Sequence, residues 1–342
     1  MIVHILTAAL AAAAAQQAVE TQDLSTAERA LVTVVGRDSS GALRGRGIGV
    51  AVAPDGHILT SAHPLHGAAV VEVTTQGGGA TFAVKATLAE SVPAELVRLA
   101  VEPAGSLPHA VLSDQVPGSG QRLFLLIPGR RIEAVVQTAR NISGLGTVLE
   151  LSARAEGEPA GAPLADAEGR IAGMVLWRSR SRPDTYIAAA ADLVQSLHPR
   201  QDAAGQHAKA CGTHAEQLYR EGVEQLVAQQ FDEARRYFER ATGSDPQCAP
   251  AWFHLGFAFA KLGRPEERVN AYRQAIAVKP DFAEAHYSLG VVYALANRRS
   301  DAVEEQKILE KLDADLAAQL AMLIEAVTHT EPQEVPETKT RI

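Results

Sequence analysis

Residues 47–68 read GIGVAVAPDGHILTSAHPLHGA, and this stretch is the most informative about the fold. Two short runs rich in Val, Ile and Leu lie on either side of an Asp-Gly pair, which is a common turn between β-strands. Similar runs are ALVTVVGR (30–37), VVEVTTQ (70–76), QRLFLLIPG (121–129), RIEAVVQTA (131–139), TVLELSA (147–153) and RIAGMVLW (170–177). Such spacing is typical of closed barrels and sandwiches. We therefore predict an all-β region over residues 26–198, with room for two barrels of similar size.

The same stretch carries a family resemblance. Its strand, Asp-Gly turn and T-S-A-H sequence closely resemble the first-barrel signature of trypsin-like serine proteases of the HtrA (Do) type. TYIAAAADLVQSL (185–197) resembles the closing strand and helix of that family, so the resemblance covers about 170 residues. It implies a double β-barrel with the catalytic groups at the cleft between the barrels.

The resemblance assigns two members of a catalytic triad. His63 falls on the histidine that takes the proton of the nucleophile as a general base. ELVRLAV (95–101) matches the start of the family's aspartate strand, which places Glu95 at the acid position with one extra methylene. Asp114 lies in a stretch that matches the later lead into the second barrel, so it is not assigned to the triad.

The nucleophile position differs from the family. GEPAGAPL (157–164) has the outline of the protease loop GNSGGPL, and anchoring on its Pro-Leu pair places Ala160 at the serine. Alanine has no hydroxyl, and loss of the serine from such a triad lowers turnover by on the order of a million-fold. Glu158 falls on the oxyanion-hole glycine, where its charge and its restricted backbone both oppose an oxyanion site.

No shift of the alignment within this loop restores a serine. None occurs between Ser152 and Ser179. Ser143, in NISGLG, is interpreted as an ordinary turn serine. The loop therefore supplies no nucleophile.

A different pattern follows and repeats every 34 residues. Aligning Gly222, Gly256 and Gly290 brings other positions into step. The matched pairs are Leu255 with Leu289, Phe259 with Tyr293, Ala234 with Ala302, Phe238 with Tyr272, Ala241 with Ala275 and Pro246 with Pro280. This is the pattern of tetratricopeptide (TPR) repeats, in which small residues let two antiparallel helices pack closely and aromatic side chains fill the space between them. We predict TPR repeats with a closing helix over residues 215–327.

The array departs from the pattern toward its end. Arg268 stands at a small-residue position of the second repeat. In the third repeat an aromatic residue, a small residue and a proline are replaced by Gln306, Leu309 and Ala314. LDADLAAQLAMLIEAV (312–327) is predicted to be an amphipathic helix that covers the open end.

The first helix of each repeat carries a candidate binding stripe. Apolar residues spaced by four positions share one helical face, and they are Tyr219, Val223, Phe253, Phe257, Tyr287 and Val291. In the TPR family this position lines the concave groove, which implies an apolar peptide or protein partner. The alternative is that these side chains are buried between helices or under the closing helix.

The two ends of the chain and the stretch between its two parts have their own patterns, and two features point to export. Residues 1–15 are predicted to be a signal peptide, since IVHILTAALAAAAA (2–15) is apolar and ends in small residues suited to cleavage. The run lacks Lys and Arg, so an uncleaved anchor or a truncated start remains open. Residues 199–214 are predicted to be a linker, and the polar residues 328–342 a disordered tail. Export to the periplasm or the medium would favour a disulfide between Cys211 and Cys248, with two buried free thiols as the alternative.

Composition excludes several classes of function. The formal net charge is −8, whereas nucleic-acid binding needs an excess of Lys and Arg. No apolar run reaches the roughly 18 residues that indicate a membrane span. No metal-ligand spacing or phosphate-binding glycine loop occurs in the sequence, so we expect no metal and no cofactor.

Two functions remain. The favoured one is an exported non-catalytic adaptor or scaffold, in which a pseudoprotease domain holds an extended segment in its cleft and the TPR module recruits a protein partner. In that case His63 is a family remnant. The alternative is an active trypsin-like serine endopeptidase with a nucleophile elsewhere, whose repeats recruit substrate.

Overall fold

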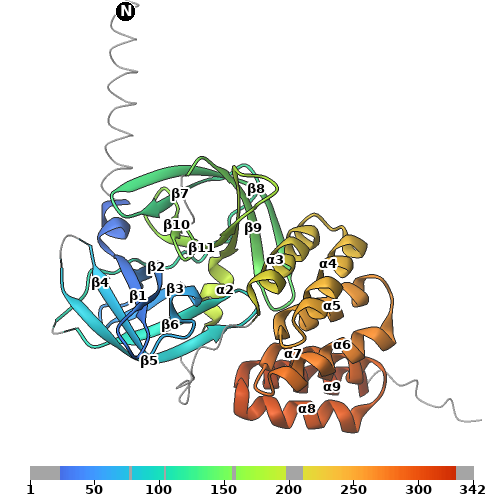
Figure 1. Ribbon diagram of the computed structural model, residues 1–342. Coiled ribbons are helices and arrows are strands. Elements are labelled where there is room, and N and C mark those ends of the chain that lie inside the picture. Colours follow the sequence, from blue (N-terminus) through green and yellow to red (C-terminus); the bar gives the residue numbers. More distant parts are fainter. Residues whose placement is uncertain (1–23, 77–78, 104, 156–158, 198–210, 329–342) are drawn as a thin grey trace, which may run out of the picture. The chain divides into compact units, whose positions relative to one another are not determined.

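The computed structural model describes residues 24–76, 79–103, 105–155, 159–197 and 211–328. The chain forms two compact units, Met1–Ala210 with Val223–Gln230, and Cys211–Gly222 with Phe231–Ile342. Strands make up most of the first unit and helices the second (Figure 1). The predicted signal peptide, nearly all of the linker and the tail beyond residue 328 lie outside the described residues.

The first barrel is closed by six strands in the order β1-β2-β3-β6-β5-β4. These are β1 (Leu31–Arg37), β2 (Leu43–Ala51), β3 (His57–Ser61), β4 (Val70–Thr75), β5 (Thr81–Ser91) and β6 (Leu96–Val101). The alternation of side chains along β1 places Val32 and Val34 inside, where they are at most 1% exposed. They pack in one core with Ile58, Val97 and Leu99.

The second barrel is closed by six strands in the order β10-β11-β12-β9-β8-β7. These are β7 (Arg122–Ile127), β8 (Arg130–Ile142), β9 (Gly146–Ala153), β10 (Pro163–Ala165), β11 (Ile171–Arg178) and β12 (Thr185–Ala190), and helix α2 (Ala191–Ser196) follows. Tyr186 is fully buried in this barrel and donates its hydroxyl hydrogen to the carbonyl of Ala155 at 3.0 Å. Two closed barrels confirm the all-β prediction.

Seven helices follow within the described residues 211–328, here called the helical region. They are α3 (Thr213–Val227), α4 (Phe231–Ser244), α5 (Ala249–Lys261), α6 (Pro265–Val278), α7 (Ala283–Leu295), α8 (Arg299–Leu312) and α9 (Ala314–Thr328). A Cβ on Gly222 would lie 2.5 Å from the Phe238 ring, and one on Gly256 would lie 2.6 Å from the Tyr272 ring. Glycine therefore lets each aromatic ring reach the partner helix, as the repeat pattern predicts.

The third repeat closes differently. Gln306 replaces the aromatic residue, and the side chain that meets Gly290 is instead Leu320 of α9. Leu320 is fully buried, and α9 packs against both α7 and α8. The closing helix thus supplies the apolar group that the degenerate repeat lacks.

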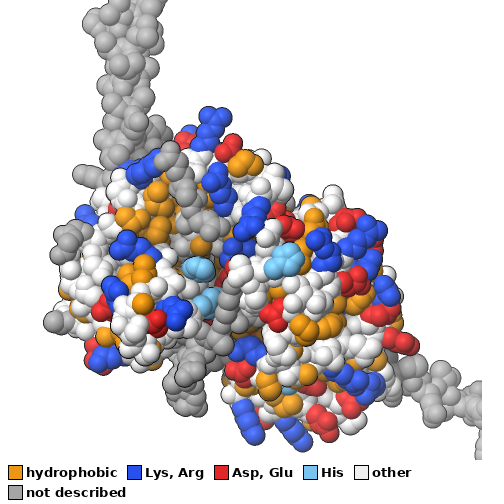
Figure 2. All heavy atoms as spheres, viewed as in Figure 1, with side chains coloured by type: hydrophobic (Ala, Val, Ile, Leu, Met, Phe, Trp, Pro, Cys, Tyr) orange, Lys and Arg blue, Asp and Glu red, His pale blue; other side chains and the backbone are white. Residues whose placement is uncertain are grey.

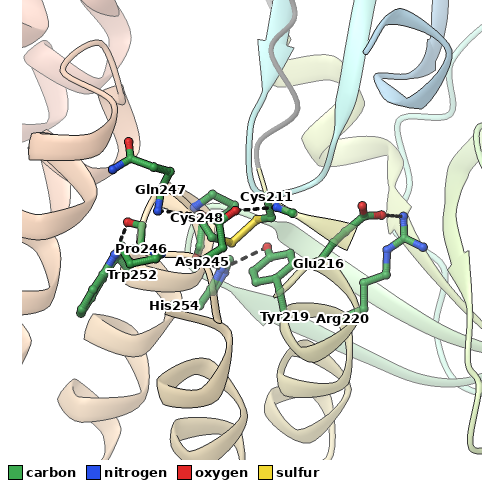
Figure 3. The surroundings of a disulfide bond; sticks show 12 residues. Cys211, Glu216, Tyr219, Arg220, Asp245, Pro246, Gln247, Cys248, Trp252 and His254 are labelled. Atoms are coloured by element: carbon green, nitrogen blue, oxygen red, sulfur yellow. Dashed lines mark hydrogen bonds and ion pairs between the residues drawn. A yellow bond between two sulfur atoms is a disulfide. The ribbon is translucent and has the colours of Figure 1, made fainter. Parts of the chain in front are cut away.

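A disulfide joins the beginnings of two helices (Figure 3). Cys211 precedes α3 and Cys248 precedes α5, and their Cα atoms are 4.4 Å apart. Asp245 holds the surrounding turn, because its carboxylate accepts from the backbone N–H of Gly212 at 2.6 Å and of Gln247 at 2.9 Å. Both cysteines are buried, so the bridge is part of the core of the helical region.

Candidate functional site

The predicted general base stands at the end of a barrel strand. β3 ends at Ser61, and the short 3-10 helix His63–Leu65 begins two residues later with a proline at its second position. His63 is exposed, and its ring lies edge-on to the ring of His66 with the centroids 6.0 Å apart. Its side chain is therefore open to solvent rather than held in the core.

The predicted acid position lies beside this strand end. Ser61 pairs with Leu96, and the N–H of Ala62 donates to the carbonyl of Glu95 at 2.6 Å. Glu95 is half-buried and has φ 51°, a left-handed conformation that costs energy for a residue with a Cβ. The strand pairing of β3 with β6 thus brings the backbones at positions 95 and 62 together.

The predicted nucleophile loop lies against the same strand end. Ala160 is followed by Gly161 at φ 79°, whose N–H donates to the Val175 carbonyl at 2.8 Å. A Cβ on Gly161 would lie 2.5 Å from the Ile48 carbonyl oxygen and 2.9 Å from the backbone nitrogen of Ser61, so only glycine fits. The structure therefore brings the loop of Ala160 to the strand that leads to His63. Glu158 lies outside the described residues.

Three other side chains bear on the enzyme alternative. The Ser61 hydroxyl is 3.2 Å from where a Cβ on Gly161 would stand, but Ser61 is only 4% exposed. Ser143 lies in the turn between β8 and β9. Asp114 is exposed and pairs with Arg170 at 3.8 Å. The Ser61 hydroxyl, which no sequence motif singled out, is buried.

The predicted binding stripe of the helical region is wrong in its first half. Tyr219, Val223 and Phe253 are at most 1% exposed and line no groove. The Tyr219 ring lies 5.9 Å from that of Phe238, and its hydroxyl lies 3.2 Å from Nδ1 of His254 (Figure 3).

Phe253 is covered by rings from two sides. Its ring centroid lies 5.7 Å from that of Tyr272 and 5.1 Å from that of Phe282. The alternative of burial between helices therefore applies to Tyr219 and Phe253. Phe257, Tyr287 and Val291 are half-buried and remain accessible in part.

Among the described residues, no group of three or more His, Cys, Asp or Glu side chains is placed to hold a metal ion. No described helix combines the length and the apolar character that crossing a bilayer requires.

Comparisons with known protein families match both parts of the chain. A model of the trypsin-like peptidase domain matches residues 47–174, and two models of the tetratricopeptide repeat match residues 219–267 and 264–296. The peroxisomal targeting signal receptor of Candida albicans is 39% identical over 70 residues, which is 20% of this chain and 12% of the receptor. The receptor of Saccharomyces cerevisiae is 38% identical over 61 residues, 18% of this chain and 10% of the receptor. The chain thus spans about a tenth of the length of these curated relatives.

Solved structures of serine proteases resemble about half of this chain. The Rv3671c protease from M. tuberculosis in its active form is 20% identical with a TM-score of 0.46, over 54% of this chain and 88% of that chain. The serine endoprotease from Yersinia pestis is 20% identical with a TM-score of 0.45, over 52% of this chain and 64% of that chain. From the family matches and the observed topology, we conclude that the chain joins a trypsin-like double β-barrel to tetratricopeptide repeats.

Proposed function

We propose that this chain is an exported, non-catalytic adaptor, in which a trypsin-like domain that cleaves no peptide bond is joined to a protein-binding TPR region. The observation that carries the proposal is Ala160, held in the turn that Gly161 fixes against the end of β3. A methyl group has no proton for His63 to take and no lone pair to attack a carbonyl, so acyl transfer does not begin there.

The same geometry explains what the domain retains. His63 is exposed, and the backbones around Ser61, Glu95 and Gly161 are fixed by strand pairing and close contact. An extended segment bound beside this strand end would meet His63 and the fixed backbone, without a group that reacts with it. We therefore assign binding, and no turnover, to the trypsin-like domain.

Protein binding by the helical region is supported by its repeats and by exposed apolar surface. Phe257, Tyr287 and Val291 are half-buried side chains on α5 and α7. The Lys261 ammonium lies 5.2 Å from the Phe257 ring centroid, so a cation borders this apolar surface.

A photo-crosslinking amino acid at Tyr287 of the full chain, expressed in its source cells, tests this binding. We expect a protein adduct. The control places the same group at Met322 on α9, which is 71% exposed. No adduct from position 287, or equal labelling from positions 287 and 322, would show that the side chains around Tyr287 do not form a protein-binding surface.

Export is supported by the disulfide between Cys211 and Cys248, because such bonds persist in oxidising compartments. The test is cell fractionation followed by sequencing of the mature N-terminus. We expect a periplasmic or secreted protein that begins at Gln16 and whose cysteines resist alkylation until they are reduced. A cytosolic protein with alkylatable cysteines would contradict export.

Cleavage of a protein substrate tests the non-catalytic assignment. The purified chain is incubated with quenched fluorescent casein beside a His63→Ala variant. We expect equal background signals, because neither chain holds a nucleophile at position 160. Cleavage by the native chain that His63→Ala abolishes would establish the endopeptidase alternative.

A further inference from the structure

A hollow in the helical region lies apart from the surfaces described above. Its volume is about 410 Å³, and it lies between the start of α6 and the end of α7. That size falls within the range of about 300–1,000 Å³ typical of ligand pockets. Its walls include Pro265, Val269, Val292 and Tyr293, and two arginines, Arg268 and Arg298, also line it.

Arg268 is the departure from the repeat pattern that the adaptor role leaves unexplained. The residues 34 positions before and after it are Ala234 and Ala302, and both are fully buried. An arginine at this position is too long for the space that alanine occupies in the other repeats. Its Nε atom is buried and has no hydrogen-bond partner among the described residues. A buried N–H donor without a partner calls for an explanation, and Arg268 also lines the hollow, where a ligand could reach its guanidinium.

The other cations near the hollow already have partners. The Arg298 guanidinium lies 4.4 Å from the Tyr293 ring centroid, and its Nε pairs with Asp301 at 2.6 Å. Arg273 donates to the Tyr293 hydroxyl at 2.8 Å. Glu266 is the one acidic side chain that lines this hollow, and the described structure gives it no ion pair with Arg268. The hollow therefore combines apolar walls with one cation that lacks a counter-ion among the described residues.

We propose that this hollow binds the carboxylate of an aspartate or glutamate side chain in a segment of a partner protein, with Arg268 as the recognising group. A guanidinium matches a carboxylate with two parallel N–H donors, and apolar walls strengthen that pairing. Pro265, Glu266 and Arg298 are exposed around the hollow, so a chain can pass across it with one side chain inserted. The inference rests on the proposed protein-binding role of the TPR region.

An array of immobilised nonapeptides with amidated C-termini tests the proposal on the full chain. Each peptide carries a central Glu between varied apolar neighbours and has a twin with Gln. We expect the chain to bind a subset of the Glu peptides and to bind their Gln twins about tenfold more weakly, which is the effect of a charge-assisted hydrogen bond. Dissociation constants for the best pairs are then measured in solution by fluorescence anisotropy.

Arg268→Ala should abolish the preference for Glu and leave the fold intact, since alanine occupies this position in the other two repeats. Arg268→Gln, which keeps much of the length, should behave in the same way. Arg236→Ala is the matched control, because Arg236 is an exposed arginine of α4 already paired with Asp232 and Glu233. That control should keep the preference.

Three results would overturn the inference. They are equal binding of Glu and Gln peptides by the native chain, an undiminished preference in both Arg268 variants, and binding only of a second peptide set made with free C-termini. The adduct from Tyr287 and the absence of casein cleavage depend on other residues. If those results hold while the Glu preference fails, the adaptor role stands and only the assignment of this hollow falls.

Discussion

At the scale of single residues, two helical glycines have opposite roles. A Cβ on Gly256 would lie 2.6 Å from the buried Tyr272 ring, whereas one on Gly243 would have no atom within 4 Å. Gly256→Ala should therefore lower the free energy of unfolding by about 1–3 kcal/mol through overpacking. Gly243→Ala should raise it by up to about 1 kcal/mol, since alanine loses less backbone entropy in a helix. Urea unfolding followed by circular dichroism at the helix band measures both, and equal effects would contradict the packing.

A buried histidine makes the helical region sensitive to pH. His286 Nδ1 lies 2.6 Å from a Glu305 carboxylate oxygen, and Nε2 lies 2.9 Å from the Pro280 carbonyl oxygen. Both neighbours are acceptors, so the doubly protonated ring satisfies both. Burial opposes that charge, but the hydrogen bonds to Glu305 and Pro280 outweigh it, and the pKa of His286 is raised above its ordinary 6.5.

A raised folded pKa means that protonated His286 stabilises the fold fully below about pH 6.5, and that this contribution is lost as the pH rises through the folded pKa. The free energy of unfolding should therefore fall as the pH rises from about 6.5 through the pKa of His286 in the folded protein. Glu305→Gln should flatten the fall, because the neutral amide no longer favours the charged ring. Denaturant titrations at a series of pH values measure this, and the same slope in native and variant chains would refute the assignment.

At the scale of elements, α9 should contribute to stability through one face. Leu320 is fully buried against Gly290, and Met322 is 71% exposed two residues later. Leu320→Ala should cost about 2–5 kcal/mol, because it leaves a cavity where the repeat lacks its aromatic residue. Met322→Ala should change the unfolding free energy by less than about 0.5 kcal/mol. Similar losses from both would mean that α9 does not close the array as described.

The disulfide between Cys211 and Cys248 should also stabilise the helical region. It closes a loop with a sequence separation of 37 between Cys211 and Cys248. In the chain-entropy account, a loop of that length stabilises by about 4 kcal/mol. Replacing both cysteines by alanine should lower the unfolding free energy by a comparable amount, measured under oxidising conditions. An unchanged value would mean that the bridge does not restrict the unfolded chain.

Strands and helices could be predicted from the sequence where a short stretch of residues carries the pattern that indicates them. Turn-bounded apolar runs indicate strands, and the 34-residue period indicates helix pairs, so both classes of fold follow from the sequence. Burial of Tyr219 and Phe253 was not predictable, because it depends on which rings cover a helix face. Phe253 is covered in part by Phe282, which aligns with Cys248 in the preceding repeat, so the pattern gave no sign of that ring.

The candidate site was predictable only through family resemblance. Nothing in the spacing of His63, Glu95 and Ala160 along the chain brings them together. The chain segments that carry them lie near one strand end, because β3 pairs with β6 and because Gly161 lies against Ser61. The hollow beside Arg268 could not be read from sequence, since an arginine at a small-residue position indicates only a departure from the repeat.

At the scale of the whole molecule, the distribution of charge fits the protein partner proposed above and not a nucleic acid. The net charge is −8, and Figure 2 shows acidic and basic side chains intermingled over the helices on the face drawn. Such a surface offers no continuous basic track for phosphates. The protein partner proposed above would be recognised by local apolar and ionic contacts. The candidates are the half-buried side chains of Phe257, Tyr287 and Val291 and the hollow beside Arg268.

The trypsin-like domain is proposed to hold no nucleophile, and labelling with a fluorophosphonate probe examines this proposal. The probe forms a covalent bond only with an activated serine hydroxyl. The purified native chain should remain unlabelled, and Ala160→Ser should gain labelling if the surrounding cleft is intact. Labelling of the native chain that disappears in His63→Ala would reveal an activated serine elsewhere and would contradict the non-catalytic account.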